Sequence, residues 1–164
     1  MIEEFQAPLP LPGASILVVD DVGVVRKAVF RFLSEVGYRV FEAASAPEAL
    51  EVLATARPPV KLVIADVVMP ELSGVGLIRQ VQQQLGDTRV LYMSAFPAEI
   101  MVREGLARPT VPFLAKPFTR DELLSKVAAV LAAAPGGDLG GPPGAKPLTG
   151  PGRYGPSEEE PTEP

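Results

Sequence analysis

Short apolar segments alternate with longer amphipathic segments along the first 133 residues of the chain. Five runs of apolar and β-branched residues, bounded by polar or turn-forming residues, predict strands at residues 16–19, 39–43, 62–65, 90–93 and 111–115. After each run, apolar residues recur at intervals of three and four, which predicts a helix. Strands that alternate with helices in this way predict an α/β fold, in which helices cover both faces of a parallel sheet.

Two of the predicted helices carry recognisable start signals. Ser45 is followed three residues later by Glu48, and Thr119 by Glu122, which is the spacing of a capping box. The segment after the fourth strand has only a weak helical pattern, over residues 98–105. We therefore expect a short helix at 98–105 and capped helices after Ser45 and Thr119.

The two ends of the chain differ in composition from the part between them. Residues 1–13 are acidic and rich in proline, and residues 134–164 are rich in Pro and Gly and finish in SEEEPTEP. Such segments bury too little apolar surface to offset the entropy lost on ordering. We expect a flexible N-terminal extension at 1–13, one folded domain at 14–133, and a disordered acidic tail or linker at 134–164.

The composition excludes several kinds of chemistry. The chain contains no cysteine and no histidine, which excludes disulfides, thiolate and imidazole metal ligands, and acid–base catalysis by histidine. A metal ion would need oxygen ligands, which suit hard cations such as Mg²⁺. The net charge of -5 does not favour a nucleic-acid surface, and no apolar run approaches the ~20 residues of a membrane span. We expect a cytoplasmic protein that binds neither nucleic acid nor membrane directly.

Polar side chains follow four of the predicted strands. Asp20 and Asp21 come after the first strand, Asp66 after the third, Ser94 after the fourth and Lys116 after the fifth. In an open parallel sheet, the carboxyl ends of the strands form the crevice in which sites lie. Each of these residues taken alone is more often a turn or surface residue. Their convergence on one crevice favours a functional site.

Four sequence motifs carry a resemblance to a known family. They are ILVVDD at 16–21, DVVMPELSG at 66–74, MSA at 93–95 and FLAKPF at 113–118. In this order on five strand–helix units, they resemble the receiver domain of two-component response regulators, over residues 14–133. The spacing between the last two motifs is similar to that of receivers in hybrid sensor kinases. The resemblance implies a flavodoxin-like, doubly wound (βα)5 fold with strand order 2-1-3-4-5.

The resemblance implies that Asp66 is the phosphoacceptor and that phosphoryl transfer depends on Mg²⁺ or Mn²⁺. The implied metal ligands are Asp21, Asp66 and the backbone carbonyl of Val68, with Asp20 acting through a water molecule. Three carboxylates in one crevice repel each other unless a cation lies among them, which agrees with this assignment. The module would assist its own phosphorylation and dephosphorylation without being a conventional enzyme.

The resemblance also assigns residues to phosphoryl binding and to a conformational switch. Ser94, Ala95 and Lys116 would bind the phosphoryl oxygens, and a cis peptide bond between Lys116 and Pro117 would direct the lysine. Ser94 and Phe113 would form the switch, because the aromatic ring turns inward when the hydroxyl moves towards the phosphoryl group. Phe113 taken alone is more often a core residue.

Two other functions remain open on the sequence. A phosphorylation-independent docking module is one, although docking would not require all five strand-end side chains together. An aspartate-nucleophile phosphatase is the other, but such enzymes typically have an acid–base aspartate two residues after the nucleophile, where this chain has Val68. A flavin-binding flavodoxin is disfavoured because no Ser/Thr/Gly-rich phosphate loop follows the first strand.

The expected partners follow from the family resemblance. They are a histidine kinase or histidine phosphotransfer protein as phosphodonor, and a downstream protein target or an output domain outside this chain. The face made by the fourth helix, the fifth strand and the fifth helix would serve for output and for homodimerisation. Together these features imply phosphorelay signal transduction.

Overall fold

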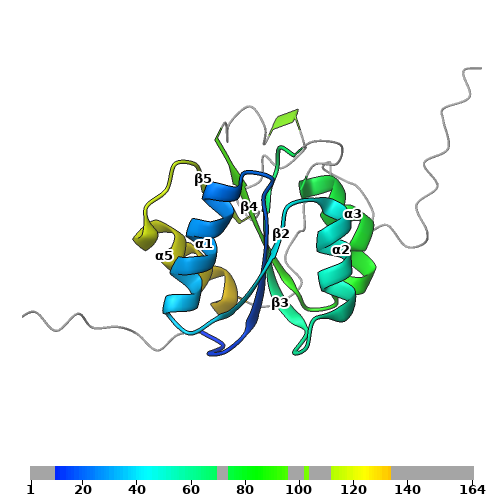
Figure 1. Cartoon of the computed structure of the whole chain (residues 1–164), viewed down its shortest axis with the longest axis horizontal. Helices are drawn as coiled ribbons and strands as arrows, with labels where there is room; N and C mark the ends of the chain where they lie inside the picture. Colours follow the sequence, from blue (N-terminus) through cyan, green and yellow to red (C-terminus); the bar gives the residue numbers. More distant parts are fainter. Residues whose placement is uncertain (1–9, 70–73, 96–101, 104–111, 134–164) are drawn as a thin grey trace, which may run out of the picture.

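The computed structural model describes residues 10–69, 74–95, 102–103 and 112–133, apart from the side chains of 81–85. Five strands form one parallel sheet in the order β2-β1-β3-β4-β5 (Figure 1). The elements are β1 (Ser15–Val19), α1 (Gly23–Glu35), β2 (Arg39–Ala43), α2 (Ala46–Thr55), β3 (Val60–Asp66), α3 (Gly74–Leu85), β4 (Arg89–Ser94), β5 (Phe113–Ala115) and α5 (Arg120–Ala132). The predicted flavodoxin-like fold and strand order are confirmed.

Helices cover the sheet from both sides. Figure 1 shows α1 and α5 on one side of the sheet, and α2 and α3 on the other. Successive residues of a strand point to opposite faces, so Ile16 and Val18 pack towards α1 and α5, whereas Leu17 and Val19 pack towards α2 and α3. All five residues of β1 are buried, which is why this strand has a continuous apolar run in the sequence.

The two predicted start signals lie at the N-terminal ends of helices α2 and α5. The Thr119 hydroxyl accepts from the backbone N–H of Glu122, and the Glu122 carboxylate accepts from the N–H of Thr119, which completes the capping box. Ser45 likewise accepts from the N–H of Glu48, but the Glu48 carboxylate accepts from Ala44 instead. Both helices are thus capped at the predicted residues, but the predicted reciprocal capping box forms only at Thr119 and not at Ser45.

Among the described strands, only β2 has the predicted bounds at both ends; β1 begins one residue early, at Ser15, and β4 extends one residue further at each end, over Arg89–Ser94. The third strand is longer than 62–65, because Val60 pairs with β1 and Asp66 pairs with Met93 of β4. In the described part of the last strand, pairing begins only at Phe113 and not at Pro112. Proline has no N–H to donate to a ladder, although its carbonyl here accepts from the N–H of Tyr92 at 3.2 Å.

Several predicted segments fall on residues that are not described. They are the N-terminal residues 1–9, the tail at 134–164, and the helix at 98–105 apart from residues 102 and 103, which are helical. The extension, tail and domain bounds therefore stay predictions. Among the described residues, no helix is both long and apolar enough to cross a bilayer.

Candidate functional site

Asp66 lies at the carboxyl end of the central strand. β3 is flanked by β1 and β4, so the ends of these two strands border the acid on both sides. The residue is 6% exposed, and its Oδ1 accepts from the backbone N–H of Val68 at 2.9 Å. The carboxylate is therefore held in a defined orientation within a largely desolvated crevice.

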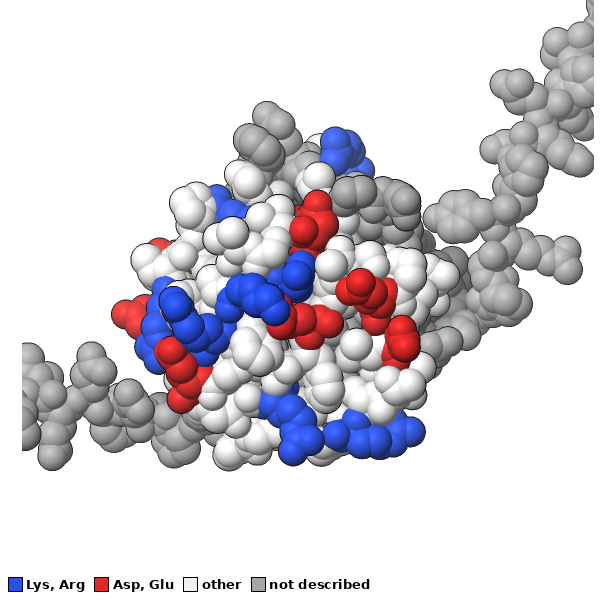
Figure 2. Space-filling model, viewed as in Figure 1, with Lys and Arg blue, Asp and Glu red and all other residues white. Residues whose placement is uncertain are grey.

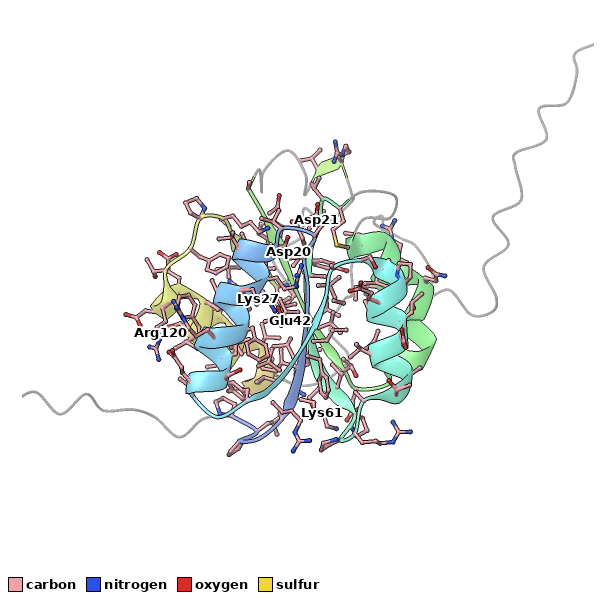
Figure 3. All side chains as sticks on the ribbon, in the orientation of Figure 1. Asp20, Asp21, Lys27, Glu42, Lys61 and Arg120 are labelled. Atoms are coloured by element: carbon pink, nitrogen blue, oxygen red, sulfur yellow. The ribbon has the colours of Figure 1, made fainter. Side chains whose placement is uncertain are left out.

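Two further carboxylates from the end of β1 meet Asp66. Asp20 is fully buried, and its Oδ1 accepts from the N–H of Val22 at 2.9 Å. Asp21 is exposed, and Figure 3 shows Asp20 and Asp21 together at one end of the sheet. Carboxylate oxygens of Asp20, Asp21 and Asp66 all lie within 4.8 Å of one another. The structure thus brings together the three acids that the sequence placed at two separate strand ends.

Lys116 links the two buried acids. Its Nζ donates to Oδ2 of Asp20 at 2.7 Å and to Oδ2 of Asp66 at 2.8 Å. The backbone N–H of Lys116 donates to the carbonyl of Ser94 at 2.8 Å, and the peptide bond to Pro117 is cis. The ammonium group is therefore fixed at the same crevice as the acids, directly after β5.

The site has two perturbed ionisable groups. Burial raises the pKa of the Asp66 carboxyl and Asp20 adds to the rise, while the hydrogen bonds from Lys116 and Val68 oppose it. Burial acts to lower the pKa of Lys116, but hydrogen bonds and charge interactions with Asp20 and Asp66 outweigh it, so this pKa is raised. Lys116 is thus held as a cation between two carboxylates.

The other predicted site residues lie on β4 and β5 or directly after them. Ser94 is buried at the end of β4, next to β3, and Ala95 is exposed immediately after it. Phe113 is half-buried at the start of β5 and packs against the core between the sheet and α2 and α3. Pro117 is exposed. The structure therefore brings Ser94 to the crevice edge, whereas Phe113 lies at the other end of its strand.

Two residues that contact this site were given no role by the sequence analysis, although Gly74 closes the DVVMPELSG motif. Gly74 begins α3 against the end of β3, and a Cβ at this position would overlap the backbone carbonyl of Asp66. Arg26 lies in the first turn of α1, and its Nη1 donates to the backbone carbonyl of Asp20 at 2.8 Å. Both contacts depend on how helices pack against strand ends, which a local pattern does not contain.

The acidic cluster has the donor set of a hard-cation site. Mg²⁺ and Mn²⁺ are bound by carboxylate, carbonyl and water oxygens, and the cluster supplies three carboxylates within reach of one ion. Asp21 is exposed, so one side of the cluster is accessible to solvent. The residues therefore fit a divalent metal ion.

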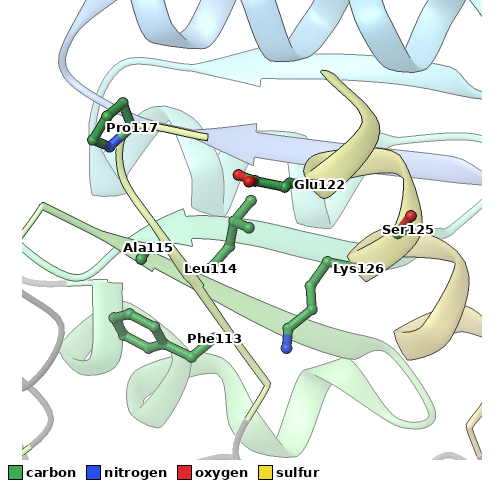
Figure 4. Close-up of a pocket in the computed structure, with 7 residues that line it drawn as sticks. All are labelled: Phe113, Leu114, Ala115, Pro117, Glu122, Ser125 and Lys126. Atoms are coloured by element: carbon green, nitrogen blue, oxygen red, sulfur yellow. The ribbon is translucent and has the colours of Figure 1, made fainter. Parts of the chain in front are cut away.

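A shallow hollow of about 610 Å³ lies between β5 and α5 (Figure 4). Its lining includes Phe113, Pro117 and Lys126, so it extends from the residue after Lys116 towards the middle of α5. The hollow lies on the predicted output face and is separate from the acidic cluster on the described surface.

Comparison with known proteins agrees with this arrangement. The model of the response regulator receiver domain family matches residues 16–128. Sensor kinase CckA of Brucella abortus (strain 2308) is 36% identical over 119 residues, which are 73% of this chain and 13% of that protein. Response regulator MprA of Mycolicibacterium vanbaalenii is 38% identical over 116 residues, which are 71% of this chain and 49% of that protein.

Solved structures give the same result. Chemotaxis protein CheY4 of Vibrio cholerae has a TM-score of 0.63 and 32% identity, over 71% of this chain and 98% of that chain. The receiver domain of hybrid histidine kinase CckA has a TM-score of 0.59 and 31% identity, over 72% of this chain and 99% of that chain. The chain spans half or less of the length of the sensor kinase and response regulator that it matches. The family match covers most of the folded part, and this chain belongs to the response regulator receiver domain family.

Proposed function

We propose that this chain is a phospho-accepting module of a two-component system, in which Asp66 receives a phosphoryl group from a phosphohistidine of a partner protein. The observation that carries the proposal is the position of Asp66 at the strand end, beside Asp20 and Asp21 and in contact with Lys116. Similarity to a sensor kinase and to response regulators supports a histidine kinase or histidine phosphotransfer protein as the donor.

The transfer is a substitution at phosphorus. A carboxylate oxygen of Asp66 donates an electron pair to form the new O–P bond, and the N–P bond of the phosphohistidine breaks. The imidazole nitrogen of the donor keeps the electron pair of that bond. The hydrogen bond from Val68 to Oδ1 fixes the carboxylate plane, so that the nucleophile meets the phosphorus in a defined direction.

A divalent cation would be held by the carboxylates of Asp21 and Asp66 and by the carbonyl of Val68, with Asp20 acting through water. When bound, Mg²⁺ or Mn²⁺ supplies positive charge that neutralises the phosphoryl oxygens as the transition state forms. Without it, the negative carboxylates of the cluster oppose the approach of an anionic donor. The module assists its own phosphorylation by this arrangement of side chains.

Lys116 and Ser94 then bind the transferred group. The ammonium of Lys116 already contacts Oδ2 of Asp66, so it can move to a phosphoryl oxygen within the same crevice. The Ser94 hydroxyl and the backbone N–H of Ala95 donate to the other oxygens. Because Lys116 would leave Asp20 or Asp66 as it moves, phosphorylation changes the contacts at the ends of β1, β3 and β5 together.

The signal passes to a protein-binding surface. Ser94 and Phe113 occupy neighbouring strands, since the start of β5 pairs with β4. A shift of the Ser94 hydroxyl towards the phosphoryl group opens space for the Phe113 ring. The hollow between β5 and α5 is lined by this ring, so its shape responds to the switch. A downstream protein or a second copy of the chain would bind there.

The proposal is tested by incubating the protein with acetyl phosphate and Mg²⁺ and measuring the intact mass. We expect a gain of one phosphoryl group, no gain in EDTA, and no gain for Asp66→Ala. Asp87→Ala, which removes an exposed acid far along the sheet, is the matched control and should label like the parent. Labelling of Asp66→Ala equal to the parent would contradict the assignment.

The same experiment separates the alternatives. A docking module independent of phosphorylation would gain no phosphoryl group under any condition. An aspartate-nucleophile phosphatase would turn over an aryl phosphate many times and accumulate little acyl phosphate. We expect neither result, because docking alone would not require Asp20, Asp66 and Lys116 to meet, and Val68 offers no acid–base group beside Asp66.

A further inference from the structure

We propose that Arg26 is a positioning residue for the metal site, because it fixes the peptide that joins Asp20 to Asp21. This inference rests on the proposed function and adds to it a residue outside the acidic cluster. Arg26 contacts neither the phosphoacceptor nor the carboxylate of Asp21 in the described structure. Its effect on the ion would pass through the main chain at the end of β1.

The guanidinium of Arg26 bridges three elements. Its Nη1 donates to the carbonyl of Asp20 at 2.8 Å, and its Nε donates to Oε1 of Glu42 on β2 at 3.3 Å. The Arg26 side chain is 17% exposed and that of Glu42 is 20% exposed, so both groups are partly desolvated. A planar guanidinium donates to two acceptors from different nitrogens in a rigid fork, whereas an ammonium is a single point charge whose donors rotate.

The contact controls the direction of Asp21. The carbonyl of Asp20 belongs to the planar peptide unit whose other end is the N–H of Asp21. On the other side of Asp20, its N–H donates to the carbonyl of Ala43 at 3.1 Å. Hydrogen bonds therefore hold the peptide units on both sides of Asp20. Asp21 directly follows the peptide unit that Arg26 holds.

The position of Arg26 is electrostatically unfavourable for a helix. Arg26 lies in the first turn of α1, where the helix dipole opposes a cation, and that turn contains no acidic residue. Glu42 and the Asp20 carbonyl compensate it. A residue that only stabilised α1 would be expected near the other end of the helix, so the structure favours a role at the acidic cluster.

A neighbouring residue provides a matched control. Lys27 Nζ contacts Oε2 of the same Glu42 at 2.9 Å, but the Lys27 side chain is 67% exposed and makes no hydrogen bond or ion pair with Asp20 in the described structure. Figure 3 shows Lys27 and Glu42 close to each other, beside Asp20. Removing either cation makes the surroundings of the metal site more negative. By charge alone, both Arg26→Ala and Lys27→Ala would bind a divalent cation slightly more tightly than the parent.

If Arg26 positions the metal site, Arg26→Ala should weaken Mg²⁺ binding, whereas Lys27→Ala should not. Mg²⁺ affinity should be measured by calorimetric titration of the metal-free full chain, without any phosphodonor. We expect Arg26→Ala to bind Mg²⁺ about threefold to tenfold more weakly, which corresponds to the partial loss of one charge-assisted hydrogen bond. Lys27→Ala should bind as tightly as the parent or slightly more tightly. In the ¹H–¹⁵N spectrum, the Val22 amide, which donates to Asp20, should shift in Arg26→Ala and not in Lys27→Ala.

Arg26→Lys keeps the positive charge and most of the aliphatic part of the side chain. If Arg26→Ala does not fold, the Mg²⁺ affinity of Arg26→Lys tests the proposal. We expect weaker Mg²⁺ binding than in the parent, since one ammonium cannot hold Glu42 and the Asp20 carbonyl as a fork. Parent-like affinity in the folded Arg26 variants would overturn this inference while leaving the proposed function standing. A parent protein that is not phosphorylated and binds no Mg²⁺ would overturn both.

Discussion

The two edges of the sheet carry opposite charges in different surroundings. At the carboxyl edge, Asp20 and Asp66 are buried and share Lys116, while at the amino edge Arg39, Lys61 and Arg89 lie at the beginnings of β2, β3 and β4. Figure 3 places Lys61 at the edge opposite Asp20 and Asp21, and Figure 2 shows basic side chains gathered along that lower edge.

Two cations of the amino edge, Arg39 and Arg89, donate to main-chain carbonyls at or just beyond helix ends. Arg89 donates through Nε and Nη2 to the carbonyl of Ala133, the C-cap of α5, at 3.2 and 2.9 Å. Arg39 donates to the carbonyl of Arg57, two residues after α2 ends, at 3.4 Å. Among the described helices, α1, α2, α3 and α5 have no basic residue in the last turn, so at α2 and α5 cations from elsewhere in the sequence lie near the negative end of the helix.

Burial decides how strongly these charges act. At the amino edge the groups remain partly hydrated, and individual ion pairs in such surroundings contribute little. At the carboxyl edge Asp20 and Asp66 are desolvated and share one cation, so removing Lys116 leaves both carboxylates unpaired. We therefore expect the loss of a cation to reduce the free energy of unfolding strongly at the carboxyl edge and weakly at the amino edge.

The largest effect is expected for Lys116→Met, which removes the ammonium and keeps the aliphatic stem. Two buried carboxylates lose their cation, and the free energy of unfolding should fall by about 3 kcal/mol in EDTA. Mg²⁺ should restore part of this loss, because it supplies positive charge to the same carboxylates. Urea denaturation with and without Mg²⁺ measures both effects. A loss below about 1 kcal/mol would mean that the carboxyl edge resembles an ordinary surface.

A smaller loss of stability is expected for Gly74→Ala. The added Cβ overlaps the Asp66 carbonyl, so α3 or the end of β3 must shift, which should reduce the free energy of unfolding by about 1–3 kcal/mol. The control is Gly23→Ala at the start of α1, where the nearest atom to the new Cβ is at 3.7 Å. Thermal melts of both variants measure the difference. Equal stability of the two would contradict the close packing at Asp66.

The stability of the Asp66→Asn variant should depend on pH differently from that of the parent. Burial raises the Asp66 pKa above its ordinary value of 3.8, so the stability contributed by this group is fully present below 3.8 and is lost as pH rises through the folded-state pKa. Asn cannot ionise, so the variant does not lose this stability as the pH rises. In EDTA, the variant should gain on the order of 1 kcal/mol over the parent at pH 7, and less near pH 4.

Asp87→Asn is the control for this pH experiment, since its carboxylate is exposed at the amino edge. Its stability relative to the parent should stay nearly constant over the same pH range. If Asp66→Asn behaved in the same way, the desolvation of Asp66 would have no measurable effect on folding.

The smallest effect is expected for Lys61→Ala. Lys61 Nζ lies 3.9 Å from Oδ2 of Asp87, and the two side chains are 41% and 69% exposed. Such a pair is screened by water, so the free energy of unfolding should change by less than about 0.5 kcal/mol. Salt up to ~1 M should remove even this difference. A loss as large as that of Lys116→Met would remove the contrast between the two edges.

The sequence alone determined the elements of the fold and the identity of the strand-end acids. Apolar spacing and capping boxes act over three or four residues, so they can be recognised without a structure, as at Thr119 and Glu122. The strand order needed more than this pattern, and it followed from resemblance to a family. The strand boundaries did not follow from the apolar pattern alone, because β3 runs beyond the predicted 62–65 and includes Asp66 itself.

Only the tertiary structure decided which side chains meet and what holds them. Lys116 contacts Asp20 across 96 positions of sequence, a contact that exists because β1, β3, β4 and β5 align their carboxyl ends. The overlap that restricts position 74, and the bond from Arg26 to the Asp20 carbonyl, arise where helices pack against strand ends. Such contacts depend on the relative placement of whole elements, whereas sequence patterns record only the placement of each residue within its own element.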